Sequence, residues 1–133
     1  MDAMGVTLPL RRSEDVVRMR QIVREHAVQQ GLSLVDQTKL VTAASELGRN
    51  VIDHGGGGEV TISTMLNGMR RGVRLVFSDQ GPGIADVQQA LRDGYSTGSG
   101  LGLGLGGAKR LCNEFAIESQ PGAGTRITVA RWK

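Results

Sequence analysis

The stretch TGSGLGLGLGGAK, residues 97–109, holds six glycines and three leucines within the ten residues 98–107. So many glycines would destabilise the interior of a helix or strand, because glycine loses the most backbone freedom on folding. Such a run is typical of backbone that comes close to a ligand, and its unobstructed N–H groups suit a phosphate. We therefore start from a phosphate-facing loop, with a purely structural glycine linker as the alternative.

Two familiar phosphate-binding patterns do not fit this stretch. The pattern GxGxxG, which begins at Gly102, belongs to dinucleotide-binding folds only when it follows a buried strand, and here it follows the loop of residues 93–98. The P-loop needs a lysine followed by serine or threonine, whereas Lys109 is followed by arginine. What fits is a loop that leads into a helix N-terminus, where free N–H groups and the helix dipole favour anions.

The composition predicts a single soluble domain over residues 1–133, with a net charge of +3. No apolar run approaches the ~18 residues of a membrane span, and no signal-peptide pattern begins the chain, so we expect a cytoplasmic protein without membrane association. The single cysteine, Cys112, is expected to be a small buried apolar residue. Because only four residues are aromatic, nucleic-acid binding is disfavoured against a solvated basic face or docking to an acidic protein.

Hydrophobic periodicity and turn residues predict a strand, two helices, two strands, a loop with a short helix, a further helix and two final strands. Because helices do not alternate with strands, this order favours an α+β layer sandwich over a doubly wound parallel sheet. Pro9 predicts that the first strand lies at an edge. The predicted strands are residues 6–10, 59–66, 73–77, 116–119 and 126–131, and the predicted helices are residues 13–30, 33–54, 87–92 and 104–113.

The caps and the apolar stripe define the first two predicted helices. Ser13 is the expected N-cap of the first helix, and Ser33, followed by Asp36, begins the second. The second helix is expected to stop at the four glycines 55–58, and its apolar stripe is Leu34, Leu40, Val41, Ala44, Leu47, Val51 and Ile52.

The second predicted helix also carries polar residues spaced by four, Glu46, Asn50 and His54, which place them on one face. Such a stripe is usually a solvated face, and that interpretation stays open. Asn50 favours a function, because asparagine is a poor residue for a helix interior while its amide oxygen is a good ligand for Mg²⁺. Glu46, one turn earlier, has the chemistry to accept a proton from an attacking hydroxyl.

Two polar residues mark strand ends. Asp79 follows the strand 73–77 and leads into a loop with Gly81 and Gly83, which is either a surface turn or a carboxylate held beside a flat ring. A carboxylate accepts a hydrogen bond from the exocyclic amine of adenine and rejects guanine, which presents a carbonyl there. Thr125, at the start of the last strand, is either a plain strand threonine or a contact near the same ring.

Taken in order, Glu-x-x-x-Asn, Asp-x-Gly-x-Gly and Gly-x-Gly-Leu-Gly resemble the N, G1 and G2 boxes of the GHKL ATP-binding superfamily. The resemblance covers nearly the whole chain and implies the Bergerat fold, with a mixed, mostly antiparallel sheet covered by helices on one face. Within that superfamily the chain is most similar to bacterial stressosome switch kinases. It departs from anti-sigma kinases after Asn50, where His54 is followed by glycines instead of Ala-Tyr.

The resemblance implies a role for each matched residue. Glu46 would be the general base, Asn50 would bind Mg²⁺ at the ATP phosphates, and Asp79 would recognise the adenine amine. Gly81 and Gly83 would shape the adenine pocket, and Thr125 would support adenine through water. The remaining nucleotide contacts would be Gly98, Gly100, Leu101, Gly102, Leu103 and Gly104.

Two basic residues are added to the family's set. Arg49 and Lys109 are candidates for offsetting the phosphate charge that develops during transfer, and each is equally well interpreted as a solvated side chain. The segment of residues 84–97 between the second and third boxes is short for an ATP lid. We expect it to become ordered only when nucleotide is bound.

The resemblance implies an ATP-dependent serine/threonine-protein kinase that phosphorylates a STAS-domain antagonist in a partner-switching pathway. A second partner would be a PP2C-type phosphatase, or a sigma factor if the chain is instead an anti-sigma kinase. ATP hydrolysis with conformational cycling is a third, less favoured reading. The sequence leaves the oligomeric state open, and a homodimer is among the assemblies that it allows.

Overall fold

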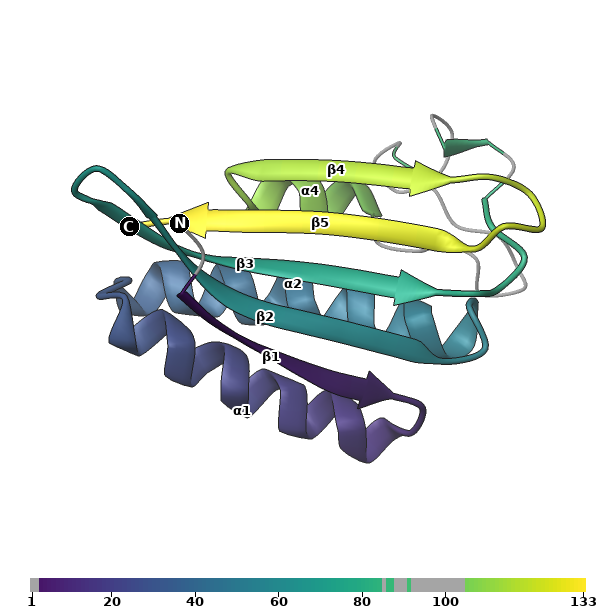
Figure 1. The fold of residues 1–133 in the computed structure, drawn as a ribbon, viewed down its shortest axis with the longest axis horizontal. Helices are drawn as coiled ribbons and strands as arrows, with labels where there is room; N and C mark the ends of the chain where they lie inside the picture. Colours follow the sequence, from purple (N-terminus) through teal and green to yellow (C-terminus); the bar gives the residue numbers. More distant parts are fainter. Residues whose placement is uncertain (1–2, 85, 88–90, 92–104) are drawn as a thin grey trace.

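The computed structural model describes residues 3–84, 86, 87, 91 and 105–133, in which helices cover one face of a single sheet (Figure 1). This arrangement confirms the predicted α+β sandwich. All four strand pairings are antiparallel, so the described strands contain no parallel pair. The elements are β1 (Ala3–Leu10), α1 (Ser13–Gln29), α2 (Leu34–Asp53), β2 (Gly58–Asn67), β3 (Arg70–Asp79), α4 (Leu105–Leu111), β4 (Glu114–Ser119) and β5 (Thr125–Trp132).

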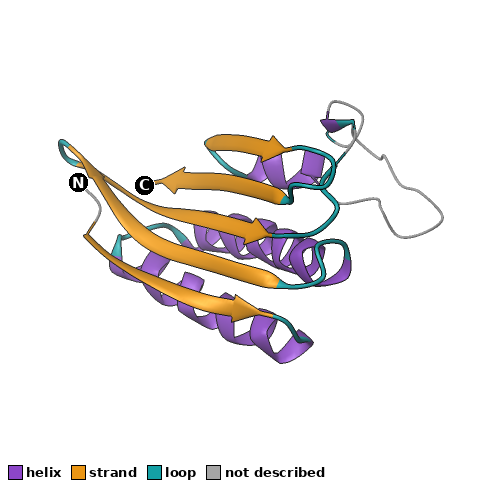
Figure 2. Cartoon of the chain, turned by 45° about the vertical axis from the view of Figure 1, so that its right-hand side comes forward, coloured by secondary structure: helices purple, strands orange, loops and turns teal. Residues whose placement is uncertain are grey.

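The sheet order is β1-β2-β3-β5-β4, which puts β3 at the centre and β1 at an edge, as Pro9 predicted. Figure 2 shows that the helices all lie behind this sheet, so its other face is open. On the open face, the hydroxyl groups of Thr7 and Thr61 lie 3.0 Å apart across β1 and β2. The antiparallel register places Asp79 opposite Gly58 on one side and Thr125 on the other.

The core forms where α1 and α2 pack against the covered face of the sheet. Met19 on α1 is fully buried, and a Cβ added at Gly48 on α2 would lie 2.9 Å from its terminal carbon, so the two helices approach closely there. Most of the predicted apolar stripe of α2 is buried or half-buried. Leu34 is the exception, because it is 71% exposed in the first turn, beyond the edge of the core.

Local hydrogen bonds explain where the first two helices begin. Ser13 is already helical, so its prediction as the N-cap was wrong, and Arg12 occupies that position. The carboxylate of Asp15 accepts hydrogen bonds from the backbone N–H groups of Arg11 and Arg12. Ser33 is the N-cap of α2, as predicted, and its hydroxyl oxygen accepts from the N–H of Asp36 at 3.1 Å.

The predicted helix 87–92 falls largely outside the described residues, and so does most of the segment 84–97 expected to act as a lid. The later helix begins at Leu105 and ends at Leu111, so it is shorter than the predicted 104–113. None of the helices in the described part of the chain has the length and apolar character needed to cross a bilayer.

Arg131 on β5 ties three elements together at one end of the fold. Its guanidinium donates to the Asp36 carboxylate on α2 at 2.7 Å and to the Leu111 carbonyl oxygen at the end of α4 at 2.8 Å. The hydrogen bonds from Arg131 lower the pKa of Asp36 against the opposing effect of desolvation. Next to α4, burial raises the pKa of the Cys112 thiol to about 11, so it stays a neutral, core-packed thiol as predicted.

We expect Asp36→Asn to lower the free energy of unfolding at pH 7 by about 1–2 kcal/mol, the range for a partly exposed charged hydrogen bond. Because the folded-state pKa of Asp36 is depressed below its ordinary value of 3.8, the contribution is fully present above about pH 4. It is lost as the pH falls through the folded-state pKa. Urea unfolding at several pH values measures the difference. A difference that did not shrink below pH 4 would contradict the ion pair with Arg131.

Candidate nucleotide-binding site

Asp79 is the polar residue on which the site is built. It ends the central strand β3 and is only 8% exposed. A carboxylate buried to this extent is tolerated only if it is hydrogen-bonded. One of its oxygens, Oδ1, accepts from the N–H of Gly81 at 2.9 Å. A carboxylate has room for further donors, so Asp79 retains the capacity to accept from a ligand.

Glycines let three backbone segments come close around this carboxylate. A Cβ added at Gly55 would lie 2.4 Å from the carboxyl carbon of Asp79, and one at Gly124 would lie 2.2 Å from its backbone oxygen. A Cβ at Gly81 would lie 2.7 Å from the Cα of Gly55. Real Cβ atoms do not approach so closely, so these positions need glycine. We call Gly55, Gly81 and Gly124 the glycine cradle.

Gly83 closes the loop after Asp79 in a conformation that favours glycine. Its φ of +76° lies in the left-handed region, and an added Cβ would lie 2.0 Å from the carbonyl oxygen of Gln120. Its own carbonyl accepts a hydrogen bond from Nε2 of His54 at 3.3 Å. The C-terminal cap of α2 thereby holds the loop that carries Gly81 and Gly83.

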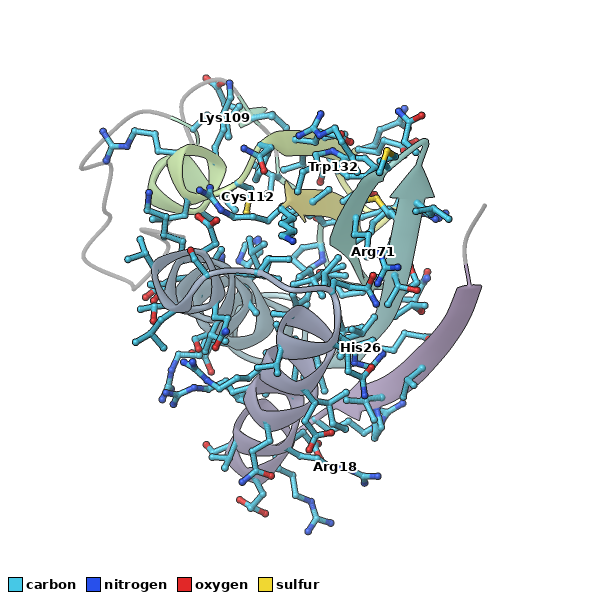
Figure 3. The ribbon with its side chains drawn as sticks, turned by 90° about the vertical axis from the view of Figure 1, so that its left-hand side faces the viewer. Arg18, His26, Arg71, Lys109, Cys112 and Trp132 are labelled. Atoms are coloured by element: carbon cyan, nitrogen blue, oxygen red, sulfur yellow. The ribbon has the colours of Figure 1, made fainter. Side chains whose placement is uncertain are left out.

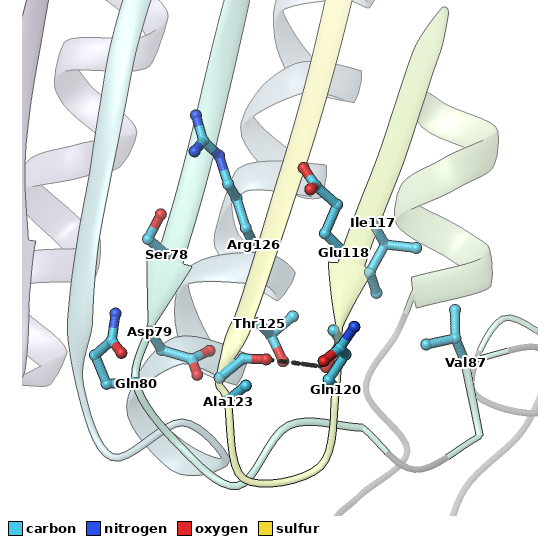
Figure 4. A pocket seen from close by; sticks show the side chains of 12 residues that line it. Ser78, Asp79, Gln80, Val87, Ile117, Glu118, Gln120, Ala123, Thr125 and Arg126 are labelled. Atoms are coloured by element: carbon cyan, nitrogen blue, oxygen red, sulfur yellow. Dashed lines mark hydrogen bonds between the residues drawn. The ribbon is translucent and has the colours of Figure 1, made fainter.

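A hydroxyl pair connects this loop to the last two strands. The Ser119 and Thr125 hydroxyl groups lie 2.8 Å apart, and the Ser119 oxygen accepts from the N–H of Ile84 at 2.8 Å. Figure 4 shows Asp79 and Thr125 side by side at the strand ends, with the hydroxyl pair drawn as a dashed line. Thr125 is 8% exposed and thus has a fixed position beside Asp79.

A narrow pocket lies where α2, α4 and the sheet meet. It brings together three predicted ligand-binding residues from separate parts of the chain, Asn50, Asp79 and Thr125, with His54 beside them. Its volume of about 10 Å³ is the space of about one water molecule. That volume is smaller than an adenine ring, and Ile84 and Leu105 also line it. The other lining residues are Leu47, Val51, Phe77 and Ile127.

A larger hollow of about 670 Å³ opens on the other side of the same strand ends (Figure 4). It is lined by Ser78, Glu118 and Arg126, which alternate with the residues of the narrow pocket and so face away from the helices. It also touches Asp79 and Thr125, but it does not reach Asn50. Among the described cavities, the narrow pocket alone joins all three predicted residues.

The remaining predicted residues lie around this pocket or outside the described residues. Glu46 and Arg49 are exposed on α2, whereas Asn50 is half-buried at the pocket wall. Lys109 is exposed on α4. The predicted phosphate contacts Gly98, Gly100, Leu101, Gly102, Leu103 and Gly104 lie outside the described residues, so their roles stay predictions.

The donor set fits a magnesium ion that is held mainly by a nucleotide. No group of three or more histidine, cysteine, aspartate or glutamate side chains that could hold a metal occurs within the described residues. Asn50 supplies one amide oxygen at the pocket wall. Mg²⁺ in phosphate-binding sites commonly takes only one or two protein ligands, with phosphate oxygens and water completing the octahedron.

Comparison with known families shows to which family the chain belongs. The profile of the histidine kinase-, DNA gyrase B- and HSP90-like ATPases matches residues 35–133, which begin at the first turn of α2 and include every described residue of the pocket. The chain belongs to this family of ATPases.

Individual relatives narrow the comparison. The chain is 42% identical over 118 residues to serine/threonine-protein kinase RsbT of Bacillus subtilis, covering 89% of each protein. It is 26% identical to the anti-sigma F factor of a Thermoanaerobacter species, over 92% of this chain and 89% of that protein. The anti-sigma F factor of Shouchella clausii is 29% identical, over 90% of this chain and 85% of that protein.

A solved structure shares the fold at lower identity. It is the crystal structure of the RsbU and RsbW domains of Rv1364c from Mycobacterium tuberculosis, with a TM-score of 0.61 and 19% identity. The match covers 98% of this chain and 33% of that polypeptide, so it extends over a part of the larger protein. At this identity the likeness supports the fold alone.

Sequence reasoning missed the roles of three residues that shape the site. Gly55 was interpreted as part of a helix stop and Ser119 as an ordinary strand residue, while His54 was placed on a helix face without a role. The signal for Gly55 was present, because four consecutive glycines exceed what a helix stop requires. The bond from His54 to Gly83 joins residues 29 positions apart and had no local signal.

We expect Gly55→Ala to weaken ATP binding by about 5- to 150-fold, the equivalent of the ~1–3 kcal/mol typical of an overpacked site. The added methyl group would displace the Asp79 carboxylate. Gly5→Ala is the matched control, since its Cβ would meet only ordinary contacts at 3.6 Å or more. Titration with a fluorescent ATP analogue measures the effect. Equal affinity of Gly55→Ala and wild type would show that the cradle does not position Asp79.

Proposed function

We propose that this chain is an ATP-dependent serine/threonine-protein kinase whose substrate is a hydroxyl group on a STAS-domain protein. The observation that carries the proposal is the pocket that joins Asn50 of α2 to Asp79 and Thr125 at adjacent strand ends. Membership of the ATPase family and 42% identity to a serine/threonine-protein kinase support it. The cytoplasm, where ATP is available and Cys112 remains a thiol, is the proposed location.

Adenine recognition is assigned to Asp79. Its carboxylate is fixed by the N–H of Gly81 and by the close approach of the glycine cradle, so little reorganisation is needed when a ligand binds. The exocyclic amine of adenine donates to the remaining carboxylate positions, whereas guanine presents a carbonyl oxygen and is repelled. Thr125, held by Ser119, offers a hydroxyl beside the same ring.

Transfer itself is assigned to the exposed face of α2. Glu46 lies one helical turn before Asn50, so its carboxylate is on the same side as the pocket wall yet remains open to an incoming protein. Glu46 takes the proton from the substrate hydroxyl while the hydroxyl oxygen bonds to the γ-phosphorus of ATP. The bond between that phosphorus and the bridging oxygen breaks, and ADP departs with the bridging oxygen. Mg²⁺, with Asn50 as a ligand, would offset the phosphate charge. Arg49 and Lys109 would add to that effect.

We expect Glu46→Ala to slow phosphate transfer by about 10²–10⁴-fold, the usual contribution of a general base, without changing ATP affinity. Glu14→Ala, which removes an exposed glutamate from α1, is the matched control. Labelled ATP and the STAS-domain protein encoded nearest to this chain provide the assay. Transfer by Glu46→Ala at the wild-type rate would exclude Glu46 as the base.

Asp79→Asn should weaken ATP binding by about 10- to 150-fold, because a hydrogen bond to a charged group contributes about 1.5–3 kcal/mol. The amide that replaces the carboxylate also presents a donor that faces the adenine amine. Asp53→Asn, at the exposed end of α2, controls for the change in charge. Calorimetric titration with ATP and GTP measures both affinity and base preference. If the Asp79→Asn variant kept both the affinity for ATP and the preference for ATP over GTP, adenine would bind elsewhere.

A second candidate function is inhibition of a sigma factor by direct binding. The anti-sigma F factors support it, because they match over about nine-tenths of this chain at 26–29% identity. The higher identity to a switch-type kinase favours a PP2C-type phosphatase as the second partner. Co-purification with each candidate distinguishes the two functions, and sedimentation of the same samples shows whether the kinase acts as a homodimer.

A further inference from the structure

Among the described residues, most of the large apolar side chains that are exposed lie at one end of the molecule. Figure 1 shows that the α1–α2 turn, the β2–β3 turn and the C-terminus gather at the left, opposite the strand ends that carry the nucleotide pocket. We call these three segments the hairpin end. Five of the seven large apolar side chains that the described residues expose lie there: Val28, Leu34, Val35, Leu66 and Met69.

Two contacts of the C-terminal residue join the three segments. The N–H of Lys133 donates to the carbonyl oxygen of Arg71 at 2.7 Å, which fixes the C-terminus against β3. The Lys133 side chain also lies against Gly31 in the α1–α2 turn, at 3.4 Å from where a Cβ would stand. Apolar side chains on the two turns are therefore connected by the C-terminus.

Cations surround the apolar residues. Arg70 lies over the Trp132 ring, 4.8 Å from its centroid, and Trp132 is held in turn by the Glu114 carboxylate at 2.6 Å. Asp36, a second carboxylate at this end, is engaged by Arg131. Arg70, Arg71 and Lys133 are exposed, so this end carries three accessible cations. Figure 3 looks onto this end and shows Arg71 and Trp132 on it.

The degree of exposure indicates an interaction surface. Met69 is 98% exposed and Leu34 is 71% exposed, although neither is needed to close a turn. Scattered exposed apolar residues are ordinary, but a cluster with polar margins marks a binding site. Methionine, arginine and tryptophan are the residues enriched in protein interfaces. A bilayer or a nucleic acid would match the charge, but the first would favour larger aromatic anchors and the second would gain nothing from the apolar cluster.

We propose that the hairpin end docks a second protein partner whose contact surface is acidic around an apolar centre. This rests on the proposed function, in which the STAS-domain substrate meets Glu46 on α2 beside the nucleotide pocket. The hairpin end lies at the opposite end of the fold from that site, so the two partners contact different surfaces of the chain. The kinase holds its second partner by a surface that its chemistry does not use.

The test measures binding and transfer with the same variants. Met69→Asp and Arg71→Glu each place a negative charge on the hairpin end, and neither side chain is buried. Val17→Asp and Arg18→Glu make the same changes at exposed positions on α1, outside the hairpin end. The probe is the PP2C-type phosphatase encoded nearest to this chain, titrated by calorimetry against the full-length kinase at 50 and 300 mM salt.

We expect each hairpin-end variant to lose about tenfold or more in affinity for the phosphatase, as removal of an interface anchor does, while both controls bind as wild type. Higher salt should weaken the wild-type complex, since the contact is partly electrostatic. Phosphate transfer to the STAS-domain protein should be unchanged in all four variants. Thermal unfolding verifies that they fold.

Several outcomes would overturn the proposal. Wild-type affinity in both hairpin-end variants, or no phosphatase binding by the wild type, would do so. A loss confined to self-association would show that the occupant is a second copy of the chain, and a loss of binding to anionic vesicles or nucleic acid would show that it is not a protein. Absence of transfer by the wild type, with phosphatase binding intact, would instead contradict the proposed kinase function and leave the docking surface supported.

Discussion

The close approach of three backbone segments around Asp79 is the constraint on which the site depends. Gly55, Gly81 and Gly124 come from the end of α2, the loop after β3 and the turn before β5, and each leaves space that a side chain would fill. Their convergence fixes a charged group at 8% exposure without surrounding it with other charges. The Asp79 carboxylate, the proposed acceptor for adenine, is thus positioned by an absence of side chains.

The sequence predicted the fold class and most elements because their causes are local. Alternation marked β2, the Ser33 cap marked the start of α2, and the edge position of β1 was readable from Pro9. Where the causes were tertiary, prediction failed. Leu34 obeys the helical period but lies beyond the core, and the N-terminal bonds of α1 go to Asp15 instead of a serine cap.

The residues of the candidate site also divide into those with a local signal in the sequence and those whose contacts are tertiary. Asn50, Asp79 and Thr125 were predicted from the order of motifs, and the structure brings them to one pocket wall. Ser119 was interpreted as an ordinary strand residue and His54 received no role, because their contacts span the fold: a hydroxyl under a loop and an imidazole against a carbonyl. Such residues acquire meaning only once distant segments are adjacent.

The pairing of Asp79 with Thr125 across β3 and β5 has a thermodynamic consequence. A slip of one residue in that register would send the two side chains to opposite faces, so only the correctly paired sheet contains the pocket. A ligand that binds the native state alone stabilises it, by about 2.7 kcal/mol when its concentration is 100 times the dissociation constant. Under the proposed function, ATP is then part of what holds the central strands in register, and a cell depleted of ATP would hold a less stable protein as well as an idle one.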